Sequence, residues 1–158
     1  MVPDSIVMHH SLTKDGETVS WGAIRRYHVE EQGWADIGYQ YGIELVGNYY
    51  EVLLGRMVNT PGAHCKENGM NSRSIGICMV GNFDVTLPPV PQYNKAVQLV
   101  CSLMDVFNIP ASRVYGHNQF ATYKSCPGKK FNMQAFREDV DRAMHNKVKH
   151  DWRWYSSR

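Results

Sequence analysis

The stretch "SIGICMVG", Ser74–Gly81, is an apolar run without polar alternation. A strand covered on both faces has this pattern, whereas a strand with one face in solvent alternates apolar and polar residues. The run therefore predicts the central strand of a sheet. Its Cys78 is predicted to be a core thiol, as is Cys101 on the apolar stripe of a later helix, because a buried thiol behaves as a small hydrophobe.

Strands and helices alternate on both sides of this central run. Periodicity, capping residues and turn residues define the other elements. They are a strand in "SIVMHHS" (Ser5–Ser11), a turn in "TKDGET" (Thr13–Thr18), a helix from Ser20 to Gly33, a hairpin of Ile37–Leu45 and Tyr49–Arg56, a helix from Pro91 to Asn108, a strand in "SRVYGH" (Ser112–His117) and a last helix over Met133–Met144. We predict an α/β fold, a single domain with a central mixed β-sheet flanked by helices.

Length and composition are those of one globular domain. The chain has 158 residues, of which 43% are hydrophobic and 20% charged, enough for one domain that buries most of its apolar surface. No apolar run approaches the ~20 residues that span a bilayer. The N-terminus, "MVPDSIVMHHSL", lacks the basic start and the apolar segment of a signal peptide, so we expect synthesis in the cytoplasm.

Possible metal ligands lie where strands end. His9 closes the first strand, His117 closes "SRVYGH", and Cys126 follows in the next loop. Two imidazoles and a thiolate form a ligand set typical of catalytic zinc sites, which leave the fourth position to water or substrate. Adjacent strand residues point to opposite faces, so only one of His9 and His10 can face a metal, and spacing does not choose between them. For each histidine alone, a packed core residue is the simpler interpretation.

Cys126 is predicted to be an exposed thiolate rather than a buried thiol. Its neighbours "KSCPGKK" are polar and basic, a setting that favours the ionised form. In a cytosolic chain such a cysteine suits a metal or catalytic role better than a disulfide. His64 and Cys65 lie in "GAHCKENGMNSR" (Gly62–Arg73), which we interpret as a separate polar loop, so neither is expected to be a fourth ligand.

Four segments together resemble a known family. They are "VMHHS" (Val7–Ser11), "GWADIGYQYGIE" (Gly33–Glu44), "GAHCKENGMNSRSIGICMVGNFD" (Gly62–Asp84) and "VYGHNQFATYKSCPG" (Val114–Gly128). In this order they resemble the type 2 zinc N-acetylmuramoyl-L-alanine amidases, which include phage endolysins and peptidoglycan recognition proteins. The resemblance covers about Ile6 to Phe136 and implies the family's central mixed sheet with helices packed against it.

The resemblance also implies roles for individual residues. It assigns zinc to His9, His117 and Cys126, catalysis to Tyr39 and Lys124, and the lining of the peptide groove to His64 and Asn71. Two features depart from the family pattern. The loop from His117 to Cys126 differs by a residue from some members, and Tyr39 stands in the region where certain bacterial relatives carry a glutamate as general acid or base.

The activity implied is zinc-dependent hydrolysis of the amide between N-acetylmuramic acid and L-alanine in bacterial peptidoglycan. We expect a monomeric phage or prophage endolysin that reaches the wall after release from the cytoplasm. Alternatives are a non-catalytic peptidoglycan-binding recognition module, a cytosolic wall-recycling amidase, and a phage protein that also binds a host or phage enzyme. Recognition proteins that do not cleave usually replace the cysteine ligand, whereas this chain has Cys126.

The C-terminal residues differ from the rest in charge. Net charge is +2, and "NKVKHDWRWYSSR" at the end holds two lysines and two arginines against one aspartate. We expect residues 1–146 to form the zinc amidase catalytic domain and residues 147–158 a basic aromatic tail that could attach to an anionic wall or membrane surface. The remainder suggests no basic face, so a nucleic acid partner is not expected.

Overall fold

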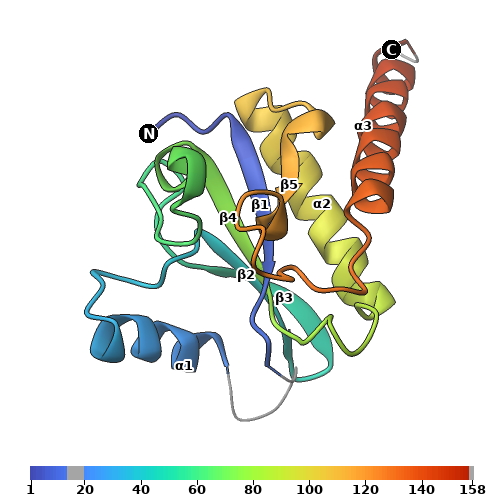
Figure 1. Ribbon diagram of the computed structural model, residues 1–158. Helices are drawn as coiled ribbons and strands as arrows, with labels where there is room; N and C mark the ends of the chain where they lie inside the picture. The colour runs from blue at the N-terminus through green and yellow to red at the C-terminus, as the bar shows by residue number, and fades with distance from the viewer. Residues whose placement is uncertain (14–19, 157–158) are drawn as a thin grey trace.

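The computed structural model describes residues 1–13 and 20–156, with side chains as far as Asn146. Five strands form one mixed sheet in the order β3-β2-β4-β1-β5 (Figure 1). Only β2 and β3 are antiparallel; the other neighbours run parallel. The strands are β1 (Ser5–His10), β2 (Tyr41–Val46), β3 (Tyr49–Leu54), β4 (Ser74–Met79) and β5 (Val114–Gly116). The expected α/β architecture is confirmed.

The central position predicted for "SIGICMVG" is confirmed. β4 pairs with β1 on one side and β2 on the other, and all six of its residues are buried. Cys78 is fully buried and Cys101 is 9% exposed, so both are core thiols as expected.

Three main helices surround the sheet, near their predicted positions. Ser20 caps α1 (Trp21–Arg26) by accepting a hydrogen bond from the Ala23 backbone N–H, and the helix continues as a π-helical turn, η1 (Tyr27–Glu31). α2 (Val90–Phe107) ends at Asn108, which adopts the left-handed conformation. α3 (Met133–Ser156) extends beyond the expected end of the last helix and across the boundary expected at residue 146.

Helices pack against both faces of the sheet (Figure 1). α2 and α3 cover the face formed by Ile6, Met8, Ile75, Ile77 and Met79. On the other face Trp21 and Ile24 of α1 pack with Ile37, Cys78 and Val80. Side chains alternate along a strand, so His10 belongs to the face of α2 and α3, and His9 to the opposite face.

Some expected elements are shorter than predicted. Ile37–Gln40 was expected in a strand, but β2 begins at Tyr41, and Val46 belongs to β2 rather than to the turn. The reason is that Gly38 O accepts from Ala63 N at 2.9 Å, which ties this segment to a loop. Likewise Ala111–Arg113 form a 3-10 turn, η3, which shortens the strand at "SRVYGH" to β5.

Two sequence expectations fall partly or wholly outside the described residues. Residues 14–19 contain most of the expected turn, and the side chains of the expected tail, 147–158, are not described. Among the described residues, none of the helices combines the length and the apolar character that a membrane span needs.

Candidate active site

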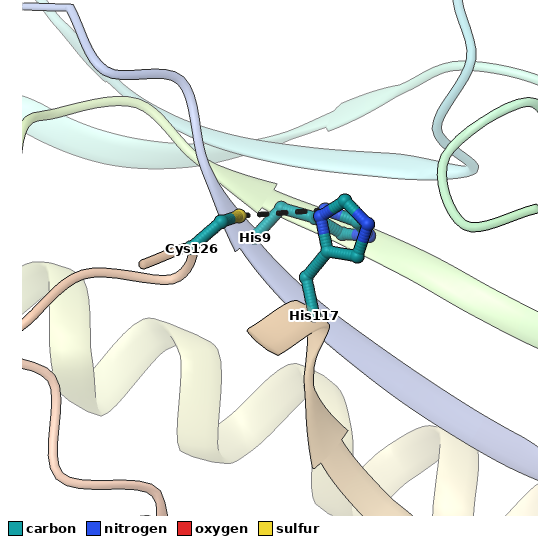
Figure 2. A group of neighbouring side chains, drawn as sticks. All are labelled: His9, His117 and Cys126. Carbon is teal, nitrogen blue, oxygen red and sulfur yellow. Dashed lines mark hydrogen bonds between the residues drawn. The ribbon is translucent and has the colours of Figure 1, made fainter. Parts of the chain in front are cut away.

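Three possible metal ligands converge at one end of the sheet. His9 lies at the end of β1, His117 follows β5, and Cys126 follows in the adjacent loop (Figure 2). Cys126 Sγ is 3.6 Å from His9 Nδ1, and the rings of His9 and His117 are 4.5 Å apart. One donor atom from each residue lies within 4.8 Å of the others. Two imidazole nitrogens and a sulfur at this spacing fit a tetrahedral zinc ion with one open position.

The loop between His117 and Cys126 closes on itself, although these residues are nine positions apart. The Asn118 backbone N–H donates to Cys126 O at 2.7 Å, and Ala121 N–H donates to His117 O at 2.9 Å. Asp84 anchors the far end of the loop, because its carboxylate accepts from Ser125 Oγ at 2.9 Å and from Lys129 N–H at 2.8 Å. These backbone and side-chain bonds bring the sulfur beside the imidazole.

Burial determines the protonation of the three residues. It lowers the pKa of His9 well below 6.5 and that of His117 to about 4, so both rings are neutral and have a lone pair for a metal. Cys126 is 9% exposed, and burial raises its pKa to about 12. The expectation that Cys126 is exposed is therefore wrong, because His9 and the backbone of His10 cover the sulfur despite its polar sequence neighbours. Metal binding would displace the thiol proton.

The loop containing His64 is not separate from the cluster, contrary to expectation. His64 is buried, its Nδ1 is 2.9 Å from His9 Nε2, and its Nε2 is 3.4 Å from Ser74 O. Gly76 makes room for this ring, since a Cβ there would lie 2.5 Å from His64 Cγ. His64 therefore supports His9 from the side opposite Cys126.

Asn71 holds the same loop in place. Its Oδ1 accepts the backbone N–H groups of His64 and Cys65, both at 2.8 Å. Asn71 and His64 also line a surface hollow beside the cluster. Their expected contact with substrate stays a prediction, while their contacts within the protein are structural.

Tyr39 and Lys124 line the same cavity as the cluster. The Tyr39 ring is 5.1 Å from that of His9, and burial, with the nearby Cys78 thiol, raises the pKa of Tyr39 well above 10, which keeps its hydroxyl a donor. Lys124 is exposed, with Nζ 5.8 Å from the centroid of the Tyr123 ring. Both residues line a cavity of about 500 Å³ that also contains the three possible ligands.

Several residues of this cavity were not singled out from the sequence. Trp34 and Tyr123 form part of its wall, and Glu67 lines a second hollow of about 380 Å³ that shares His117 and Lys124 with the first. Glu67 Oε2 is 3.9 Å from His117 Nε2. The only sequence signal was proximity, because Glu67 lies in the loop of His64 and Tyr123 directly precedes Lys124.

Comparison with known proteins assigns the family. The family profile described as N-acetylmuramoyl-L-alanine amidase matches residues 1–129. This chain belongs to that family. The resemblance on which the sequence prediction was based is thereby confirmed.

Individual members of the family align over most of the chain. Peptidoglycan-recognition protein SC2 of Drosophila melanogaster is 35% identical over 128 residues, 77% of this chain and 66% of that protein, so the chain spans slightly less than two thirds of it. The endolysin of Escherichia phage T7 is 35% identical over 130 residues, 78% of this chain and 80% of the endolysin.

Solved structures share the fold. The N-acetylmuramoyl-L-alanine amidase LysC from Clostridium intestinale superposes with a TM-score of 0.77 at 27% identity, covering 89% of this chain and 87% of LysC. Drosophila PGRP-LB superposes with a TM-score of 0.69 at 29% identity, covering 82% and 78% of the two chains. The fold that the sequence predicted is thus the amidase and peptidoglycan recognition fold.

Proposed function

We propose that this chain hydrolyses the amide between N-acetylmuramic acid and L-alanine in peptidoglycan, using zinc held by His9, His117 and Cys126. The observation that supports this most directly is the buried set of three donors beside a cavity in a chain of the amidase family. A set of three protein ligands leaves a coordination position open, as catalysis requires. A module that only binds peptidoglycan has no need of that open position.

The lactyl amide is unreactive in water, so the site must provide a nucleophile and stabilise an oxyanion. When bound, zinc supplies a water nucleophile at neutral pH and polarises the carbonyl as a Lewis acid. Tyr39 and Lys124 supply the remaining hydrogen-bond donors. Both residues line the same cavity, and each would donate to the developing oxyanion, a contribution on the order of 3 kcal/mol per donor.

His64 and Ser74 keep the His9 ring correctly oriented. With His9 Nδ1 turned toward Cys126, its Nε2–H can donate to His64 Nδ1 at 2.9 Å, and His64 Nε2–H can donate to Ser74 O. A ligand histidine whose second nitrogen is hydrogen-bonded holds one tautomer and one ring orientation. His64 would therefore contribute to metal binding as well as to the groove.

We further propose that the chain acts as a monomeric phage or prophage endolysin, synthesised in the cytoplasm and acting on the wall after release. Support comes from the endolysins of Escherichia phage T7 and Enterobacteria phage K11, which are 35% and 34% identical and covered over 80% and 82% of their lengths. A cytosolic wall-recycling amidase would have the same site. Lysis from outside by added protein, compared with turnover of soluble muropeptides alone, separates these two roles.

The product of digestion tests the reaction. Purified peptidoglycan incubated with the protein should gain free L-alanine amino groups without new reducing sugar ends, both measured by labelling and mass spectrometry. New reducing ends without free alanine amines would indicate a glycosidase and contradict the proposal.

Metal content tests the ligands. Zinc should be near one ion per chain, as three protein ligands and an open position require, and should fall sharply in His117→Ala. His145→Ala is the matched control, because His145 lies on an exposed part of α3. Full zinc content in His117→Ala would show that the ligands were wrongly assigned.

A further inference from the structure

We infer that Glu67 is a positioning residue that holds the His117 ring for metal binding and, through Tyr123, fixes the segment that carries Lys124. This inference rests on the proposed zinc site. It concerns a residue of the loop Gly62–Arg73 that the resemblance assigned no role.

The orientation of His117 supports this inference. One ring nitrogen of His117 faces Cys126 and the other points away from it (Figure 2). The nitrogen near Glu67 is Nε2, at 3.9 Å from Oε2, which leaves Nδ1 for the metal. Once Nδ1 is coordinated, Nε2 carries a proton and needs an acceptor. Carboxylates are a common acceptor for this second nitrogen in metal sites.

Glu67 has a charged acceptor close to this nitrogen, and both side chains are at least partly buried. The His117 side chain is 8% exposed and that of Glu67 19% exposed. The present 3.9 Å separation is longer than a hydrogen bond, so the carboxylate must approach by about 1 Å to accept one. The inference requires this approach of the Glu67 side chain, which belongs to the first residue of η2 (Glu67–Ser72).

The same carboxylate has two further donors. Tyr123 Oη donates to Oε1 at 2.9 Å, and the Cys65 thiol donates to Oε2 at 3.7 Å. Tyr123 belongs to the loop between His117 and Cys126, while Cys65 belongs to the loop Gly62–Arg73. Glu67 therefore links these two loops, and its bond to Tyr123 limits where the adjacent Lys124 can lie.

The two effects can be separated by substitution. Glu67→Gln keeps the shape of the side chain but removes the charge that favours a bond from His117, whereas Tyr123→Phe removes only the contact next to Lys124. Glu51→Gln on β3 is the matched control, because it removes one carboxylate at an exposed position away from the cavity.

The experiment measures zinc affinity by competition with a chromophoric chelator, the absorption spectrum of the Co²⁺-substituted protein, and kcat for each variant. Glu67→Gln should weaken zinc binding about 10- to 100-fold and alter the Co²⁺ spectrum, as loss of an outer carboxylate does in other metal sites. Tyr123→Phe should keep zinc affinity within about threefold and lower kcat. Glu51→Gln should match the wild type in all three measurements.

The possible outcomes test the role of Glu67 separately from the proposed zinc amidase function. If the wild type binds one zinc and Glu67→Gln has the same affinity and the same Co²⁺ spectrum, Glu67 does not position His117, and the proposed function is unaffected. If the wild type binds no zinc, the proposed function itself is wrong. Cys65, Glu67 and His117 also have donor atoms within 4.8 Å of one another, so two zinc ions in the wild type and one in Glu67→Gln would make Glu67 a ligand and overturn the positioning role.

Discussion

His9 and His10 are adjacent in β1 but have different surroundings. His10 Nδ1 accepts the Phe83 backbone N–H at 3.1 Å, on the face of the sheet that α2 and α3 cover. His9 points to the other face and contacts both His64 and Cys126. The alternation of side chains along a strand explains the difference. One residue of offset thus decides which imidazole can share a metal with Cys126.

Lys124 and Tyr39 should act in catalysis without holding the metal. An ammonium has no lone pair for zinc, and a protonated tyrosine hydroxyl is a poor ligand. We expect Lys124→Ala and Tyr39→Phe to keep the zinc content and to lower kcat about 100- to 1,000-fold each, the usual cost of losing an oxyanion donor. Zinc quantification beside wall-lysis kinetics measures both effects.

Lys129→Ala is the control for the lysine variant, since Lys129 is exposed near the same loop and its bond to Asp84 uses the backbone N–H. If the Lys124 and Tyr39 variants lyse walls at a near-native rate, neither residue is catalytic. Lys124 would then be a solvated surface charge, Tyr39 a packed aromatic residue, and the metal the sole catalyst.

At the scale of elements, the loop that follows η4 (His117–Gln119) depends on a close backbone approach. Gly128 has a φ of +126°, a backbone conformation that residues with a side chain rarely adopt. A Cβ at this position would lie 2.5 Å from the backbone carbonyl carbon of Phe83. Lys130 N–H donates to Phe83 O at 2.8 Å, which keeps the two segments together. The glycine thus allows the segment after Cys126 to pack against the chain after β4.

Gly128→Ala should destabilise this packing. We expect a loss of roughly 2–4 kcal/mol in the free energy of unfolding, from backbone strain plus the clash with Phe83. Gly47→Ala is the control, because Gly47 also has a positive φ, +63°, but open space around it, and it should lose only about 1 kcal/mol. Urea denaturation of both variants measures the difference, and equal losses would show that the loop yields to the added methyl group.

For the whole molecule, the candidate site links segments distant in sequence. His9 comes from the first strand, and His117 and Cys126 come from the connection between β5 and α3, more than 100 residues later. β1 and β5 are parallel neighbours, so their carboxyl ends meet at the same edge of the sheet. A metal at this point would tie the N-terminal strand to the C-terminal third of the chain.

Zinc should therefore stabilise the folded protein. A ligand that binds only the native state at 1,000 times its Kd adds about 4 kcal/mol, which for a chain of this size raises Tm by roughly 8–16 °C. Thermal unfolding with excess zinc and with a chelator measures the shift, with His117→Ala as the control that should show none. An equal Tm in both conditions for the wild type would argue against a native-state zinc site.

Local sequence determined the main elements of this protein. The unbroken apolar run Ser74–Gly81 specified the central strand, Ser20 the start of the first helix, and helical spacing the residues of α2. These predictions succeeded because periodicity and capping depend on near neighbours in the chain. The sequence also predicted the chemical types of the candidate ligands, since a histidine or cysteine has the same donor atoms wherever it lies in the fold.

Only the tertiary structure decided which of these residues meet, and in what environment. His64 is 55 positions from His9 yet lies 2.9 Å from it, Glu67 Oε2 lies 3.9 Å from His117 Nε2, and Cys126 is buried despite polar neighbours. Burial and long-range contact depend on how separate segments pack, and packing is set by the whole core rather than by any local pattern. The sequence alone therefore determined the strands, helices and candidate donors, while their packing decided the contacts and protonation of the site.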